Sequence, residues 1–141
     1  MSDTFVSASW LADRLDEVRV VDVRDAWEYD GIGHVPGAVS VPFDEFRSSA
    51  GDAGMLPGVA RWAELLAAAG VGDDDEIVAY DDEHGVFAAR FLVTAELYGH
   101  DPERLYVLDG DYSSWSREHE TARETVDVDR TEYEPGEPAD S

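Results

Sequence analysis

Polar side chains that could do chemistry directly follow short apolar runs of this sequence. Arg24 comes after a valine-rich run, and Asp81 and Asp82 come after Ile77–Tyr80. An arginine can bind an anion, and neighbouring carboxylates can bind Mg²⁺ or supply a nucleophile. A thiol is missing, because none of the 141 residues is a cysteine. Disulfides, thiolate metal sites and cysteine nucleophiles are therefore excluded from the chain.

The elements that must position these side chains alternate between helix and strand. Apolar periodicity predicts helices at 7–15, 57–69 and 86–98, a last short helix opening at 113, and strands at 19–23, 38–41, 76–80 and 105–108. This alternation predicts an α/β fold, a parallel sheet with helices on both faces. Ligands of such sheets bind beyond the carboxyl ends of the strands, so the loops that begin at Arg24, Asp81 and Asp109 should meet.

Acidic residues outnumber basic ones 33 to 10, which gives a formal net charge of -23. This charge repels nucleic acid and anionic membranes, and we expect neither as a partner. Because salt at about 1 M shortens the screening length to about 3 Å, it would relieve the self-repulsion of such a chain, and we expect a halophilic, acidic protein. No targeting segment or apolar stretch of about 20 residues is evident, so we expect a soluble, cytoplasmic protein.

Three motifs in a fixed order give the chain a family resemblance. They are Val21-Asp22-Val23-Arg24 with Glu28-Tyr29 and Gly33-His34-Val35-Pro36-Gly37-Ala38; Val78-Ala79-Tyr80-Asp81 with Gly85; and Val107-Leu108-Asp109-Gly110 with Trp115. From about Val6 to Trp115 the chain resembles the rhodanese family of sulfurtransferases, although Asp111 replaces the second glycine of the last motif. The resemblance implies a rhodanese-like parallel sheet with helices on both faces.

The same resemblance places Asp81 where active members carry their catalytic cysteine. That cysteine holds sulfur as a persulfide, cradled by backbone N–H groups of the following loop. A carboxylate can occupy the cradle but cannot accept sulfane sulfur and pass it on. We therefore predict no catalytic residue in this chain. The vestigial active-site loop would consist of Asp81, Asp82, Glu83, His84, Gly85 and Val86.

A cysteine-less loop of this kind resembles the N-terminal half of tandem thiosulfate and 3-mercaptopyruvate sulfurtransferases. The resemblance implies a pseudoenzyme, the non-catalytic half or a structural or regulatory partner of a sulfurtransferase, with a cysteine-containing rhodanese domain as its partner. We expect the domain to cover residues 1–118. Residues 119–141 are expected to be an acidic, linker-like tail, because their last part is rich in Pro, Gly and Glu.

Two other functions stay open on the sequence. The chain could be a stand-alone protein-interaction module. It could also be a Mg²⁺-dependent phosphoryl-transfer or receiver-like domain that uses Asp81 and Asp82, although the D-x-D-x-T pattern of one such class is absent.

Other conspicuous side chains have structural interpretations. Arg24 matches an anion-binding position of some active members, but an ion pair with Asp22, Asp25 or Glu28 is the stronger interpretation. His34 is expected to bridge backbone groups of its loop. Core or interdomain packing accounts for Trp27, Trp62 and Trp115. We expect no cofactor and no metal, since the histidines lack ligand-like spacing.

Overall fold

The computed structural model describes residues 5–25, 27–42, 59–72, 75–82, 85–109, 111–122 and 131. In these ranges, one sheet of five parallel strands has the order β1-β5-β4-β2-β3. The strands are β1 (Phe5–Val6), β2 (Arg19–Asp22), β3 (Val39–Ser40), β4 (Ile77–Tyr80) and β5 (Leu105–Leu108). The α-helices are α1 (Ala8–Ala12), α3 (Val59–Ala68), α4 (Val86–Leu97) and α5 (Asp111–Glu118), and two short turns are the π-helical η1 (Glu28–Ile32) and the 3₁₀-helical η2 (Pro102–Arg104). The predicted α/β fold is confirmed.

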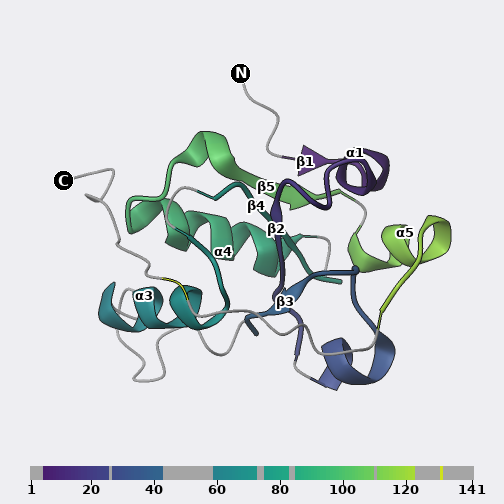
Figure 1. Ribbon diagram of the computed structural model, residues 1–141, viewed down its shortest axis with the longest axis horizontal. Helices are drawn as coiled ribbons and strands as arrows, with labels where there is room; N and C mark the ends of the chain where they lie inside the picture. The colour runs from purple at the N-terminus through teal and green to yellow at the C-terminus, as the bar shows by residue number, and fades with distance from the viewer. Residues whose placement is uncertain are drawn as a thin grey trace.

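Helices cover both faces of the sheet (Figure 1). Side chains alternate between the faces of each strand, so the two faces bury different residues. On one face, Trp62 of α3 and Phe91 of α4 pack in the same cluster as Val21 and Ala79. On the other face, α1 and α5 pack against the sheet through the cluster of Leu11, Trp115, Val20, Val78 and Leu108. All four residues of β4 are buried, which explains why its sequence is a continuous apolar run.

Most predicted elements are present, with ends that differ by a few residues. The Oγ of Ser7 accepts a hydrogen bond from the Trp10 N–H at 3.0 Å and caps α1, as predicted, but the helix ends at Ala12. The expected helix start at Pro57 lies outside the described residues. Three elements were not predicted: β1, which is too short to show an alternating pattern; η1, which lies in a segment predicted only as turns; and η2, a single 3₁₀ turn of three residues.

The segment that follows α5 packs back onto the domain. Two backbone hydrogen bonds join His34 and Ala122: the His34 N–H donates to the Ala122 carbonyl at 2.7 Å, and the Ala122 N–H donates to the His34 carbonyl at 2.8 Å. Nε1 of Trp115 donates to the Glu120 carbonyl at 2.7 Å, and Oγ1 of Thr131 donates to the Val71 carbonyl at 2.6 Å. Residues 119–122 and 131 thus contact the domain, whereas the rest of 119–141 lies outside the described residues. The boundary at 118 stays a prediction. No helix in the described ranges is both long and apolar enough to cross a membrane.

Candidate functional site

Asp81 directly follows β4, and its carboxylate reaches the start of α4. Its Oδ1 accepts a hydrogen bond from the Gly85 N–H at 2.9 Å, and its Oδ2 accepts from the N–H groups of Phe87 at 2.7 Å and Ala88 at 2.9 Å. The residue is 1% exposed. Backbone N–H groups at the start of a helix lack partners within the helix and favour negative charge. The anion cradle at the start of α4 is therefore filled by a side chain of the protein itself.

Gly85 provides the backbone conformation that this turn needs. Its φ of 84° lies in the left-handed region, which favours glycine. A Cβ at this position would lie 3.5 Å from Val107 Cγ1 and 3.8 Å from Phe5 Cε1, which are ordinary contacts. Backbone conformation, rather than lack of space, is thus the reason for a glycine here.

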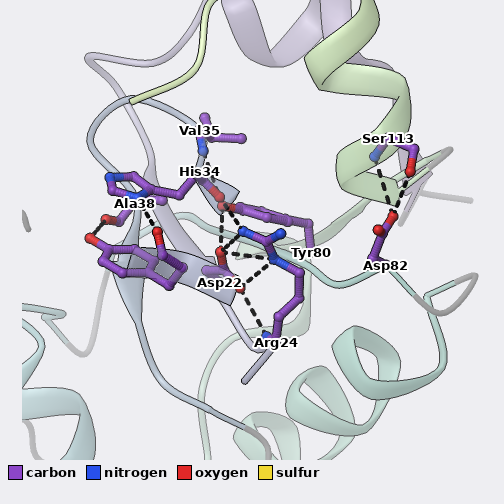
Figure 2. Close-up of polar contacts among 10 residues, drawn as sticks. Asp22, Arg24, His34, Val35, Ala38, Tyr80, Asp82 and Ser113 are labelled. Atoms are coloured by element: carbon purple, nitrogen blue, oxygen red, sulfur yellow. Dashed lines mark hydrogen bonds and ion pairs between the residues drawn. The ribbon is translucent and has the colours of Figure 1, made fainter. Parts of the chain in front are cut away.

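Arg24 is buried in an ion pair with Asp22 at the carboxyl end of β2 (Figure 2). Nη2 of Arg24 lies 2.7 Å from Asp22 Oδ2 and also donates to the Gly33 carbonyl at 2.5 Å. The hydroxyl of Tyr80 donates to Asp22 Oδ2 at 2.8 Å and accepts from the Val35 N–H at 3.1 Å. Of the predicted partners of Arg24, Asp22 is the one it pairs with in this network, and anion binding by Arg24 stays a prediction.

This network shifts the titration of its members. Burial, the largest single influence, would lower the pKa of Arg24, but the hydrogen bond and charge of Asp22, with smaller help from Tyr80 and Glu28, raise it. Burial, followed by the charge of Asp22, holds the pKa of Tyr80 well above its ordinary value of 10.0. The guanidinium carbon of Arg24 also lies 4.1 Å from the ring centre of Tyr112. The Arg24 side chain is thus held in place by Asp22, by the Gly33 carbonyl and by the Tyr112 ring.

His34 is fully buried beside this network. Its Nδ1 lies 3.1 Å from the Tyr29 carbonyl, and its ring stacks on the Tyr29 ring with centroids 3.9 Å apart. Because a carbonyl only accepts, Nδ1 must carry the proton. Nε2 then has no hydrogen-bond partner among the described residues. The predicted contact between the ring and the backbone of its loop is present.

The loops that follow β2, β4 and β5 meet at one edge of the sheet, as predicted. The Tyr112 N–H donates to the Asp81 carbonyl at 3.0 Å, and the hydroxyl of Ser113 donates to Asp82 Oδ1 at 2.8 Å (Figure 2). The ring of Tyr112, at the start of α5, also contacts the guanidinium of Arg24. In the vestigial loop, Val86 is exposed. Glu83 and His84 lie outside the described residues.

The described residues include no group of three or more His, Cys, Asp or Glu that could hold a metal ion. Asp81 directs both carboxylate oxygens to backbone N–H groups, and Asp82 contacts Ser113. The geometry therefore offers no support for a Mg²⁺ site built on these two carboxylates.

Sequence reasoning did not identify the central role of Asp22 and Tyr80. One signal was available: Asp22 interrupts an apolar run of valines, and a buried carboxylate requires partners. Tyr112 gave no such signal, because its contact with Arg24 depends on the loop that follows β5.

The five-stranded parallel sheet and the anion-favouring loop at its edge define a rhodanese-like domain. The family described as "Rhodanese-like domain" matches residues 7–118, and the chain belongs to this family.

Relatives extend this finding. The chain is 37% identical to a thiosulfate sulfurtransferase of Corynebacterium glutamicum over 82% of this chain and 38% of that protein. It is 30% identical to 3-mercaptopyruvate sulfurtransferase of Escherichia coli over 84% of this chain and 46% of that protein. The crystal structure of SseA from Escherichia coli, a 3-mercaptopyruvate sulfurtransferase, shares the fold, with a TM-score of 0.87 and 24% identity over 99% of this chain and 58% of that chain. The chain spans less than half the length of the two curated relatives.

Proposed function

We propose that this chain is a rhodanese-family domain that transfers no sulfur by itself and acts as the non-catalytic half, or as a structural or regulatory partner, of a thiosulfate sulfurtransferase system. The observation that carries the proposal is the carboxylate of Asp81, which fills the anion cradle in a chain without cysteine. A carboxylate oxygen cannot accept and pass on the sulfur that active members of the family hold on a cysteine thiolate.

The reaction that this domain would serve is a double displacement. A cysteine thiolate attacks the outer sulfur of thiosulfate, the S–S bond breaks, and sulfite leaves with the bonding electrons. Cyanide then attacks the outer sulfur of the cysteine persulfide, thiocyanate leaves, and the thiolate is restored. The cysteine for both steps must come from outside these 141 residues.

The names and lengths of the relatives support this proposal. They are named thiosulfate sulfurtransferase and 3-mercaptopyruvate sulfurtransferase, and this chain matches 38% and 46% of their lengths. The remaining length is sufficient for a second domain of similar size.

A direct test compares the purified chain with an Asp81→Cys variant in molar salt. We expect no thiocyanate from thiosulfate and cyanide with the wild-type chain, and a cyanide-releasable persulfide on the variant. Asp82→Cys is the matched control, because its thiol would lie one residue away and outside the cradle. Turnover by the wild-type chain would overturn the proposal.

A second candidate function, a stand-alone interaction module, is favoured by the 64% exposure of Trp27. The two functions differ in a mixing experiment. The sulfurtransferase activity of a cysteine-containing rhodanese should rise when the chain is added if the chain is a sulfurtransferase partner. Stoichiometric binding of unrelated proteins, without a change in this activity, would favour the interaction module.

A further inference from the structure

Two of the four histidines lie where residues 119–122, which we call the return segment, pack back onto the domain. His34 exchanges two backbone hydrogen bonds with Ala122, at one end of the segment. His119 is the first residue after α5, and the centre of its ring lies 4.5 Å from that of Trp115. The return segment therefore begins at one imidazole and is held by another.

Both imidazoles leave a buried nitrogen without a partner. Nε2 of His34 and Nε2 of His119 are buried and have no hydrogen-bond partner among the described residues. Nδ1 of His34 donates to the Tyr29 carbonyl, so its Nε2 is the atom that would take up a further proton. By contrast, Nε2 of His100 lies 2.9 Å from the Asp75 carbonyl. A proton on Nε2 of His34 would create a buried charge without an acceptor in the described part of the chain.

Neighbouring charges add to the cost of this proton at His34. Arg24 donates to the Gly33 carbonyl, one residue before His34, and its positive charge opposes a second one (Figure 2). Asp22 would attract an imidazolium, but its carboxylate already accepts hydrogen bonds from Arg24 and Tyr80. The titratable and charged side chains that adjoin the two rings come from each neighbouring element: Asp22 and Arg24 at the end of β2; Asp25, Glu28, Tyr29 and Asp30 in or next to η1; Tyr80 of β4; Tyr112 of α5; and Glu118 and Glu120 beside His119.

The two histidines differ in what surrounds them. Glu118 and Glu120 are exposed next to His119, and their carboxylates favour a positive charge there. His34 is fully buried, and the nearest carboxylate group of its network, Asp22, is committed to other donors. His34 is therefore the residue at which protonation conflicts most with the packed conformation.

We infer that protonation of His34, assisted by that of His119, releases the return segment, so that pH controls its docking. An imidazole that is open to water takes up a proton at about pH 6.5. Release of the segment opens both rings to water, so the released state binds more protons than the packed one. A state that binds more protons gains population as the pH falls. Docking is thus complete above about pH 7 and is lost as the pH falls toward about 5.

This switch goes beyond the proposed function, because it holds whether or not the domain serves a sulfurtransferase. The return segment leads from the domain into the rest of the chain. Acid pH would therefore change how firmly the domain holds the residues that follow it.

Hydrogen exchange of backbone amides, measured by NMR on the full chain in molar KCl, tests the switch. The Ala122 amide reports the docking of the return segment, and the amide of Val78, in the middle of the sheet, is the internal reference. Rates are expressed as protection factors, which removes the pH dependence of exchange in an unfolded chain.

The variants remove the titrating groups one at a time and together. His34→Asn keeps a donor near the place of Nδ1 but carries no charge, and His119→Phe keeps a ring beside Trp115. His100→Asn is the matched control, because His100 is also buried but contacts Asp75 instead of the return segment. Circular dichroism establishes that each variant is folded.

We expect the protection of Ala122, relative to Val78, to fall by at least about tenfold from about pH 7.5 to about pH 5 in the wild-type chain and in His100→Asn. The fall should be less than about threefold in the double variant of His34→Asn and His119→Phe, since neither side chain then titrates. Relative protection that is independent of pH in the wild type, or an equal fall in the double variant, would overturn the inference.

A second measurement decides the question if the double variant does not fold. The Hε1 resonance of His34 in the wild-type chain should titrate over the same pH range in which Ala122 loses its protection. A proton gained on His34 while Ala122 stays protected would overturn the switch.

Discussion

Asp81 and Asp82 are neighbouring carboxylates with different surroundings. Asp81 is buried and accepts three backbone hydrogen bonds at the start of α4, whereas Asp82 is exposed and contacts Ser113 of α5. Each carboxylate thus connects its loop to a different helix. At the scale of single residues, the acidic pair has two separate structural roles.

This difference predicts unequal effects on stability. Asp81→Ala should lower the free energy of unfolding by about 2–4 kcal/mol, because it leaves three N–H donors at a buried helix start without their acceptor. Asp82→Ala should cost less than about 1 kcal/mol, since its partners remain accessible to water. Urea unfolding monitored by circular dichroism measures both values. Equal losses would contradict the role assigned to the Asp81 cradle.

The raised pKa of Tyr80 predicts a loss of stability in alkali. Unfolding frees this phenol to lose its proton near pH 10.0, whereas the folded protein keeps it protonated to higher pH. Stability from this group is therefore fully present below pH 10 and falls as the pH rises above it. Tyr80→Phe should flatten this fall, although it also loses the hydrogen bond to Asp22.

The matched control is Tyr106→Phe, because burial also raises the pKa of Tyr106, but less than that of Tyr80, since the Tyr106 side chain is only partly buried. Removal of the Tyr106 hydroxyl should leave most of the loss of folding stability above pH 10 in place. Unfolding free energies measured from pH 8 to about pH 11 give both slopes. A wild-type slope that persists in Tyr80→Phe would contradict the assignment.

The sequence indicated part of the site. The position of Asp81 in its loop and an ion pair of Arg24 could be predicted, because a polar residue after a buried strand lies at the edge of the sheet. Core packing was wrong for Trp27, which is 64% exposed, because a tryptophan in a turn-rich segment points outward as readily as it packs inside; interdomain packing of Trp27 stays a prediction. The pairing of Arg24 with Asp22, rather than with Asp25 or Glu28, depended on the burial of both side chains at the carboxyl end of β2.

At the scale of elements, the segment after α5 bears on where the domain ends. A chain that stops at residue 118 would lose the backbone pair of His34 with Ala122 and the bonds of Thr131 to Ala67 and Val71. We expect it to be less stable by about 4 kcal/mol, at about 1 kcal/mol for each of these hydrogen bonds. A chain that stops after residue 131 keeps these bonds and is the control. Equal urea midpoints for the two chains would support a boundary at 118.

Central elements were predicted more accurately than peripheral ones. The strand at 105–108 was predicted with the bounds it has, and β4 differs by one residue, because both are continuous apolar runs between polar loops. β1 was missed, since its two residues depend on pairing with β5 for their conformation. η1 was missed for a similar reason: tertiary contacts of Tyr29 stabilise it, and no local periodicity marks it.

At the scale of the whole molecule, a net charge of -23 predicts strong dependence on salt. The melting temperature should rise from low to molar KCl, because screening reduces repulsion among carboxylates. A triple variant of the exposed Asp13, Asp16 and Asp30 to Asn should show a smaller rise. Differential scanning calorimetry measures both. A melting temperature that is independent of salt would contradict the expected halophilic character.

The occupied cradle also has a consequence for how the domain could respond to sulfur compounds. A ligand in solution fills its site according to its concentration, whereas Asp81 is covalently part of the chain and is present at every concentration. The loop at the start of α4 therefore has the conformation of a saturated site when sulfur donors are scarce and when they are plentiful. A small anion from solution would have to displace a carboxylate that is tethered to the chain, so the conformation of this loop should not depend on anion concentration.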